Sequence, residues 1–270
     1  MAPHNALFPA LLKYWRHRRG LSQLDLALAA EVSARHVSFL ETARAQPSPN
    51  MVLRLGATLK LPLREQNALL RAAGHAPAFA EPELSQEVDA PVRKAIERML
   101  RQHEPYPMVV MNRRYDVVQT NQAATRLFMH FVADASALVP PLNVFHLLFD
   151  PRLARSYVMD WEALAHHLLS RLHVEALERG HDEALSGLVR QLLEYPDVPA
   201  SFRQPDFAAA PAATIPVRLK REALDVSFLT TVTVFNAPGN VTLEELRMES
   251  YFPLDELTEQ VCQQLAAAAG

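Results

Sequence analysis

Three neighbouring polar residues, Arg35, His36 and Ser38, share the outward face of a short predicted helix. The planar guanidinium of an arginine can donate two parallel hydrogen bonds to O6 and N7 of guanine, and histidine or serine can bind base edges or phosphates. Val37 and Leu40 fall on the opposite face, where they would attach the helix to a core. The pattern is typical of a helix that presents hydrogen-bonding groups to double-stranded DNA.

Metal and enzymatic chemistry have less support. His166, His167 and His173 fall on one predicted helix, where neighbouring residues point about 100° apart. No Glu-x-x-His pair and no cysteine cluster supplies further ligands, so we expect no metal site. The sequence also has no glycine-rich phosphate loop, no Gly-x-Ser-x-Gly motif and no motif histidine near its single cysteine, Cys262. We therefore expect a protein that is not an enzyme and requires no cofactor.

The composition is that of an ordinary folded protein. Of the 270 residues, 49% are apolar, 7% aromatic and 21% charged, which excludes intrinsic disorder. A single cysteine cannot form an internal disulfide, and no apolar run approaches the roughly 18 residues of a membrane helix. An apolar segment at residues 6–12 precedes a basic cluster, which is the wrong order for a signal peptide. We therefore expect a cytoplasmic location and no contact with a membrane.

Charge is distributed unevenly along the chain. Residues 1–75 contain 10 Lys and Arg against 4 Asp and Glu, a balance of +6. The remainder contains 17 against 26, a balance of −9, so the net charge is −3. Residues 76–91, which are rich in proline and acidic side chains, separate the two parts. We predict a basic domain over residues 1–75 that approaches a polyanion, a linker over residues 76–91 and an acidic domain over residues 92–270.

Five short helices are predicted in the basic domain. Capping residues, prolines and glycines place them at residues 7–19, 22–30, 33–42, 48–59 and 62–74. Ser22, Ser33 and Ser48 have side chains that are preferred at the N-cap. A turn of about three residues joins the second and third helices, which is the helix-turn-helix arrangement. Such a pair places the later helix in the major groove of B-DNA, about 12 Å wide, while the N-terminus of the earlier helix meets a phosphate.

Six motifs in this domain follow a known spacing. They are Leu21-Ser22-Gln23, Leu26-Ala27, Val32-Ser33, Val37-Ser38, Leu40-Glu41 and Pro47-Ser48. Together they resemble the DNA-binding domains of Cro/CI-type phage repressors, the XRE family. The resemblance implies that Gln23 contacts a phosphate and that Ser33 caps the recognition helix. It also implies a set of residues that face or flank the groove, namely Ala34, Arg35, His36, Ser38, Phe39 and Arg44. Arg35 is the residue that we expect to recognise a base.

Two positions depart from the family pattern. Glu31 follows the second helix and Ala43 follows the third, where family members usually have glycine. Glycine adopts the left-handed backbone conformation freely, whereas another residue there costs about 1–2 kcal/mol. We therefore expect these turns to be either strained or differently shaped. Glu41, by contrast, is expected to be structural and to accept hydrogen bonds from an arginine or from the backbone.

The acidic domain is predicted to contain two strands, several helices and three further strands. Its periodicity predicts a helix over residues 92–103, strands over 108–112 and 115–119, helices near 121, 157–172 and 184–192, and strands over 217–220, 224–234 and 246–252, with a turn at 237–240. We expect a mixed sheet in the order of a PAS-like fold. The predicted fold class is thus α+β, a five-helix Cro/CI-type helix-turn-helix domain followed by a PAS-like mixed α/β sensor domain.

Motifs along nearly the whole chain match one family of regulators. They are Arg16-His17-Arg18-Arg19, Ser22-Gln23-Leu24-Asp25, Ser33-Ala34-Arg35-His36, Glu104-Pro105-Tyr106-Pro107, Pro141-Leu142-Asn143, Trp161, Ser227-Phe228, Thr231-Val232-Thr233 and Phe252-Pro253. Together they resemble the MmyB-like regulators, which join an XRE domain to a PAS-like ligand-binding domain. The resemblance implies a transcription regulator. It also implies that in at least some members a fatty acid occupies the PAS-like cavity.

Candidate ligand contacts in the acidic domain fall into three groups. The residues that could line a pocket, bind a polar head group or pair with a carboxylate are, respectively, Trp161 and Phe228; Asn143, Thr231 and Thr233; and Arg126, Arg155 and Arg247. Each has an alternative interpretation. An apolar interior is first of all a packed core, and polar residues in strands and loops are usually satisfied locally.

Two functions are compatible with these patterns. The first is a dimeric DNA-binding regulator whose acidic domain binds a small apolar ligand such as a fatty acid. Two protomers would bind half-sites about 34 Å apart, and the ligand would alter their spacing through the linker and the helix over residues 92–103. The second is a DNA-binding protein whose acidic domain docks another protein and holds no ligand.

Overall fold

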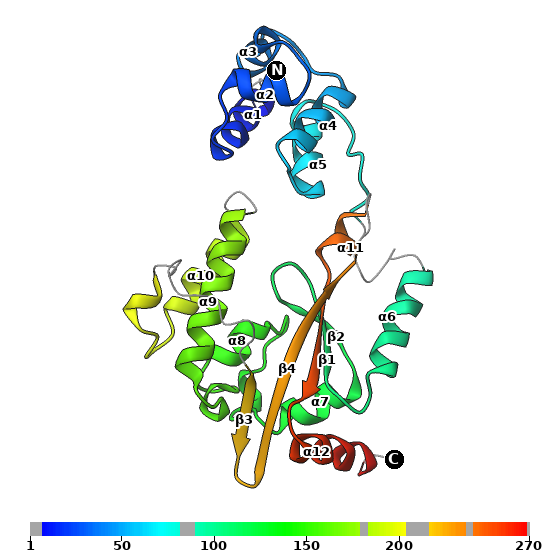
Figure 1. Cartoon of the computed structure of the whole chain (residues 1–270), viewed down its shortest axis with the longest axis vertical. Coiled ribbons are helices and arrows are strands. Elements are labelled where there is room, and N and C mark those ends of the chain that lie inside the picture. The colour runs from blue at the N-terminus through cyan, green and yellow to red at the C-terminus, as the bar shows by residue number, and fades with distance from the viewer. Residues whose placement is uncertain (1–6, 82–89, 179–182, 204–215, 236–239, 269–270) are drawn as a thin grey trace. The chain divides into compact units, whose positions relative to one another are not determined.

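A computed structural model describes residues 7–81, 90–178, 183–203, 216–235 and 240–268 of the chain (Figure 1). These residues divide into two compact units. The N-terminal unit contains the described residues up to 81 together with residues 240–244. The C-terminal unit contains the described residues from 90 to 177, from 183 to 235 and from 245 onwards. A short segment late in the sequence therefore groups with the N-terminal unit.

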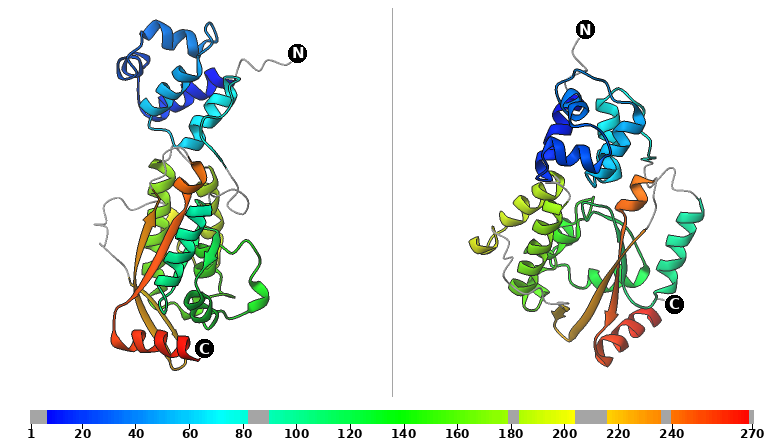
Figure 2. Two further views of the ribbon diagram at one scale, coloured as in Figure 1. Left: turned by 90° about the vertical axis from the view of Figure 1, so that its right-hand side faces the viewer. Right: turned by 45° about the horizontal axis from the view of Figure 1, so that its top comes forward.

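The N-terminal unit contains the five predicted helices. They are α1 (Leu7–Arg18), α2 (Gln23–Ala29), α3 (Ala34–Glu41), α4 (Pro49–Thr58) and α5 (Leu63–Ala72), which Figure 2 shows in two orientations. One core joins them, with Leu12, Leu26, Leu40, Leu55 and Leu69 all fully buried. The prediction of a five-helix unit is confirmed.

Serine side chains begin three of these helices, as predicted. Ser22 accepts a hydrogen bond from the amide of Asp25 at 3.1 Å, and the Asp25 carboxylate accepts one from the amide of Ser22 at 2.8 Å. Ser33 caps α3 by accepting from the amide of His36 at 3.1 Å, and Ser48 likewise caps α4. Each cap satisfies an amide that would otherwise lack a partner in the first helical turn.

A buried ion pair joins α1, α2 and α3. Nε of Arg16 lies 2.6 Å from Oε1 of Glu41, and the two side chains are only 7% and 2% exposed. The amide of Gln23 donates to the same carboxylate at 2.8 Å, and Arg16 also donates to the carbonyl of Leu21 at 2.8 Å. Burial opposes ionisation of Glu41, but the hydrogen bonds from Arg16 and Gln23 outweigh it and lower its pKa. Glu41 thus has the structural role predicted for it.

The two turns that lack the family glycine keep the conformation that glycine favours. Glu31 has φ 54° and Ala43 has φ 57°, both in the left-handed region. Of the two alternatives, these turns are therefore strained and not reshaped. The cost of about 1–2 kcal/mol at each residue has to be offset by the packing of the neighbouring helices.

The chain that follows α5 lies against that helix. Asn67 donates to the carbonyl of Phe79 at 2.8 Å and to the carboxylate of Glu81 at 2.6 Å. Arg64 pairs with Glu81 at 3.3 Å, and Arg71 pairs with it as well. The first part of the predicted linker is thus fixed to the N-terminal unit.

A short helix that the sequence analysis did not predict completes this unit. It is α11 (Val241–Glu245), and the amide of Val241 donates to the carbonyl of Ala80 at 2.9 Å. Ala80 also forms an isolated parallel bridge with Asn240. Most of the predicted turn at residues 237–240 and most of the predicted linker lie outside the described residues.

The C-terminal unit is built on a five-stranded sheet. Its strands are β1 (Met108–Met111), β2 (Val117–Thr120), β3 (Val217–Arg221), β4 (Leu224–Val234) and β5 (Arg247–Pro253), in the spatial order β2-β1-β5-β4-β3. Each neighbouring pair of these strands is antiparallel, so the prediction of a mixed sheet is wrong. The reason is that the helices between β2 and β3 carry the chain to the opposite edge of the sheet and not to a neighbouring parallel strand.

Helices lie on both sides of this sheet. They are α6 (Ala90–Gln102), α7 (Gln122–Met129), α8 (Val144–Phe149), α9 (Trp161–Glu178), α10 (Glu183–Leu193) and α12 (Glu256–Ala267), with short 3₁₀ turns at Ala135–Ala137, Arg155–Tyr157 and Ala200–Arg203. Figures 1 and 2 show α9 and α10 on one side and α6 on the other. The order of two strands, helices and three strands follows the prediction.

Replacing Glu41 by glutamine should destabilise the N-terminal unit. The variant would leave Arg16 charged and buried without its partner, which costs about 3–5 kcal/mol. Because folding lowers the pKa of Glu41, its contribution to stability is present above the ordinary pKa of a glutamate and is lost as the pH falls below it. Hydrogen exchange of peptides from α1 to α5 should show a large loss at neutral pH and a small one in acid. Glu256→Gln, at an exposed site on α12, is the control, and an equal loss there would contradict the prediction.

Candidate functional site

The recognition helix α3 presents a small polar and aromatic surface. Arg35 is exposed, and its guanidinium carbon lies 5.0 Å from the ring centroid of Phe39. This cation–π contact restricts the orientation of the guanidinium. Of the other residues predicted to meet DNA, Ser33 caps the helix, Arg44 is exposed, and Ala34, His36 and Ser38 are half-buried. Their contact with DNA stays a prediction.

Gln23 has a structural contact that the sequence analysis did not foresee. It stands at the first position of α2, where an amide could reach a phosphate. Its Nε2, however, already donates one hydrogen bond to Glu41. Because an amide nitrogen carries two protons, the second is the one that a phosphate could use. Phosphate binding by Gln23 therefore stays a prediction, and its loss would also disturb the ion pair beneath α3.

The C-terminal unit contains a cavity of about 370 Å³. Side chains of the sheet form one wall, and side chains of α7, α8 and α9 form the other. The apolar part of the lining includes Val109, Phe128, Phe131, Leu148 and Leu164. A space of this size and lining is suited to a small molecule with an apolar body.

Five residues, which we name the polar wall, interrupt this apolar lining: His167, Arg171, Thr230, Glu249 and Tyr251. Nε of Arg171 is buried and has no hydrogen-bond partner among the described residues. Burial raises the pKa of Glu249, although Arg171 and hydrogen bonds from Thr230 and Tyr251 act against it. Burial also lowers the pKa of His167, and Arg171 adds to this effect, which favours the neutral imidazole. The polar wall can both donate and accept hydrogen bonds.

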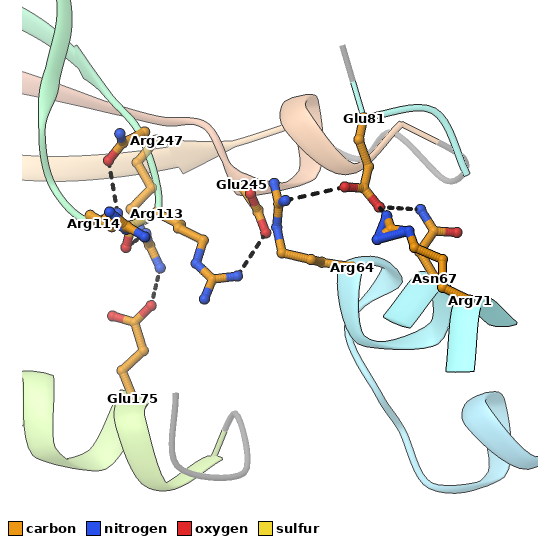
Figure 3. A network of polar contacts seen from close by, with 10 residues as sticks. Arg64, Asn67, Arg71, Glu81, Arg113, Arg114, Glu175, Glu245 and Arg247 are labelled. Atoms are coloured by element: carbon orange, nitrogen blue, oxygen red, sulfur yellow. Dashed lines mark hydrogen bonds and ion pairs between the residues drawn. The ribbon is translucent and has the colours of Figure 1, made fainter. Parts of the chain in front are cut away.

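Tyr115 connects the cavity to a network of charged groups (Figure 3). Its hydroxyl donates to Glu175 at 2.6 Å, and its φ of 66° lies in the left-handed region. Arg247 pairs with the same carboxylate and lies 4.7 Å from the tyrosine ring centroid. Arg247 also donates to the carbonyl of Arg113 at 3.3 Å, and Arg113 pairs with Glu245 at 3.2 Å. A residue of the cavity lining is thus linked to the last residue of α11.

The predicted ligand contacts lie away from this cavity. Asn143 caps α8 and donates to the carbonyl of Arg114 at 2.7 Å. Trp161 donates to the carbonyl of Leu148 at 2.8 Å, and Phe228 is fully buried in the core. These three side chains are satisfied by the protein itself, and none is among the described residues that line the cavity.

The remaining candidates are also used elsewhere. Thr231 and Thr233 are exposed on β4, on the opposite face from Thr230. The guanidinium of Arg155 lies 3.9 Å from the centroid of the Trp161 ring. Two other arginines have polar partners in the protein, since Arg126 donates to Gln122 and Arg247 pairs with Glu175. The described lining contains none of these candidates.

Two classes of site are not found in the part of the chain that the structure describes. No three histidine, cysteine, aspartate or glutamate residues there are grouped so that they could hold a metal ion. None of the described helices combines the length and the apolar character needed to cross a membrane.

Comparisons with known families agree with this division into two units. The family model of the MmyB-like transcription regulator ligand binding domain matches residues 92–265, more than half of the chain. This chain belongs to the MmyB-like transcription regulators. A helix-turn-helix domain model matches residues 8–69. Neither is an enzyme family, and together they make the chain a DNA-binding transcription regulator with a ligand-binding domain.

Similarity to individual proteins is low. A search of curated proteins gives no match. One solved structure, described as "Structure of an RNA-binding Light-Oxygen-Voltage Receptor", is 14% identical over 98% of this chain with a TM-score of 0.28. The MmyB-like regulator spans 64% of the length of that receptor chain. At this distance the similarity does not bear on the function.

The polar wall of this MmyB-like regulator was missed by the sequence analysis. Arg171 follows Leu168 on the apolar stripe of α9, and a charged residue on such a stripe is a signal that could have been used. Glu249 and Tyr251 alternate with Met248 and Ser250 along β5, and the sequence analysis assigned the core to the second pair. Met248, Ser250 and Tyr251 are all buried, so both faces of β5 are covered.

Substituting Arg35 by alanine should weaken binding to the cognate operator by about 1–3 kcal/mol and relax recognition at one base position. Gln23→Ala should instead weaken binding to all sequences alike. The operator is first selected from random DNA, and affinities are then measured at fixed salt. Arg54→Ala, an exposed arginine on α4, is the control for loss of charge. A uniform loss for Arg35→Ala would show that Arg35 does not recognise a base.

Proposed function

We propose that this cytoplasmic regulator binds its operator as a dimer and changes its affinity for DNA when an apolar ligand, such as a fatty acid, occupies the cavity. The observation that carries the proposal is the enclosed apolar cavity with its polar wall inside the ligand-binding domain. The dimer is expected because one helix-turn-helix recognises few base pairs, so two half-sites about 34 Å apart are needed for specificity.

The size of the cavity favours a ligand over a partner-docking module. Packed protein interiors contain few voids larger than a water molecule, whereas ligand sites have volumes of roughly 300–1,000 Å³. The cavity of about 370 Å³ falls in the second range, and its lining is mostly apolar. A docking module would need no enclosed space. The strand order β2-β1-β5-β4-β3, with helices over the sheet, supports the PAS-like description of this unit.

Coupling between ligand and DNA is proposed to run through α11. Tyr115 lies in the cavity lining and is linked through Glu175 and Arg247 to Arg113, which pairs with Glu245 at the end of this helix (Figure 3). At its other end, α11 is bonded to Ala80. A ligand that moves Tyr115 could therefore change the position of a helix that groups with the N-terminal unit.

The same route continues into the N-terminal unit. Glu81 follows Ala80 directly and holds Arg64, Asn67 and Arg71 of α5. This route differs from the one through α6 that the sequence suggested. It is supported by a continuous series of hydrogen bonds and ion pairs within each unit, joined by the covalent chain of α11.

Organic extraction of the purified protein tests the ligand. We expect mass spectrometry to detect a bound fatty acid or related acyl compound, and we expect delipidated protein to bind the selected operator with an affinity that differs from that of the lipid-loaded protein. Protein that retains full operator binding, carries no lipid and shows no change with any acyl compound would favour the partner-docking alternative.

A second experiment tests the route of coupling. Glu245→Gln removes the charge that pairs with Arg113, so the variant should bind the acyl ligand normally but lose most of the ligand-dependent change in operator affinity. Glu244→Gln, at the exposed neighbouring position of α11, is the matched control. If both variants respond to the ligand as the parent protein does, the signal does not pass through this ion pair.

A further inference from the structure

The polar wall limits the chemistry of the group that can lie against it. Arg171 projects from α9, and its buried Nε has no acceptor among the described residues. An occupant therefore has to offer a hydrogen-bond acceptor at this point. Because the guanidinium is always charged, an anionic acceptor satisfies it better than a neutral one, and an amine is repelled.

Glu249 sets a second condition on the same occupant. The groups that face its carboxyl are Arg171 from α9, Thr230 from β4 and Tyr251 from β5. His167 and Tyr115 complete the titratable groups in the described lining. An ionised Glu249 would repel an anionic occupant, whereas a protonated Glu249 would donate a hydrogen bond to it. Burial favours the protonated form, because it raises the pKa of this carboxyl.

Three acyl head groups can be compared against these two conditions. An ester accepts from Arg171 but brings no charge to neutralise the guanidinium. An alcohol can donate to Glu249 or accept from Arg171, and it also leaves the guanidinium without an anion. A carboxylate neutralises Arg171 and accepts from protonated Glu249 at the same time. The carboxylate is thus the head group that uses both residues fully.

We propose that the polar wall selects a carboxylic acid head group, which pairs with Arg171 and shares one proton with Glu249. This inference rests on the proposed function, since it assumes that the cavity holds an acyl chain. No covalent bond forms or breaks. The ligand arrives as a carboxylate, and the shared proton is the one that Glu249 already carries or, at higher pH, one taken up from water.

The pH dependence of binding follows from this proton. Below its raised pKa, Glu249 is protonated and donates to the ligand. Above that pKa, binding requires uptake of one proton, so the affinity for a carboxylic acid should fall by about tenfold for each further pH unit. An alcohol and an ester have no charge to be repelled, so their affinities should change little.

The test uses the delipidated full-length protein and three probes of equal chain length: dodecanoic acid, 1-dodecanol and methyl dodecanoate. Dissociation constants are measured by calorimetry across neutral and mildly alkaline pH, where the free acid stays ionised. We expect the acid to bind at least about tenfold more tightly than the other two at the lowest pH, and this advantage to shrink as the pH rises.

Two variants assign the effect to the two residues. Glu249→Gln keeps a donor for the carboxylate and cannot ionise, so it should retain binding of the acid and lose the pH dependence. Arg171→Gln should weaken binding of dodecanoic acid at least about tenfold while leaving 1-dodecanol unchanged. Glu256→Gln and Arg190→Gln, at exposed sites on α12 and α10, are the matched controls and should behave like the parent protein.

Other results would overturn the inference in distinguishable ways. Equal binding of the three probes at every pH would show an acyl site that does not select its head group, and the proposed function would stand without the inference. Binding of the acid that is tight but independent of pH in the parent protein would refute proton sharing with Glu249. Failure of all three probes to bind would remove the proposed acyl ligand and the inference together.

Discussion

Neutralisation of buried charge is the constraint on which both units of this regulator depend. In the N-terminal unit, Glu41 holds Arg16 and Gln23 and so fixes α1, α2 and the recognition helix to one another. In the C-terminal unit, Glu175 holds Arg247 and Tyr115, which come from distant parts of the chain. One carboxylate thus sets the orientation of several elements in each unit, since an unpaired buried charge is strongly disfavoured.

The cavity is where this pairing is incomplete among the described residues. Arg171 lacks an acceptor at Nε, and it lies beside Glu249 and over the ring of Tyr115. The sequence could not identify these residues, because helical and strand periodicity assigns a face but does not say which face meets a cavity. Both faces of β5 are covered, so the alternation of apolar residues there had no single interpretation. The predicted arginines failed for the same reason, since local partners in the fold hold them.

Much of the fold could be predicted because its signals are local. Ser22, Ser33 and Ser48 begin helices through hydrogen bonds to amides three residues later, which depend on no distant contact. The direction of strand pairing depends instead on where the intervening helices carry the chain, and the mixed sheet was therefore wrong. Glu31 and Ala43 are an intermediate case: the sequence located the two unusual turns, and tertiary packing decided that they keep the left-handed conformation.

The position of α11 within the sequence affects how this regulator could be recombined. The helix sits between β4 and β5 of the sensor sheet, yet Val241 bonds to Ala80 near the end of the first unit. A chimaera made by fusing a foreign head at residue 82 would keep α11 and discard the carbonyl to which it bonds. Head and sensor are therefore not freely exchangeable modules. A functional hybrid would have to inherit residues 78–81 and 240–245 from the same parent.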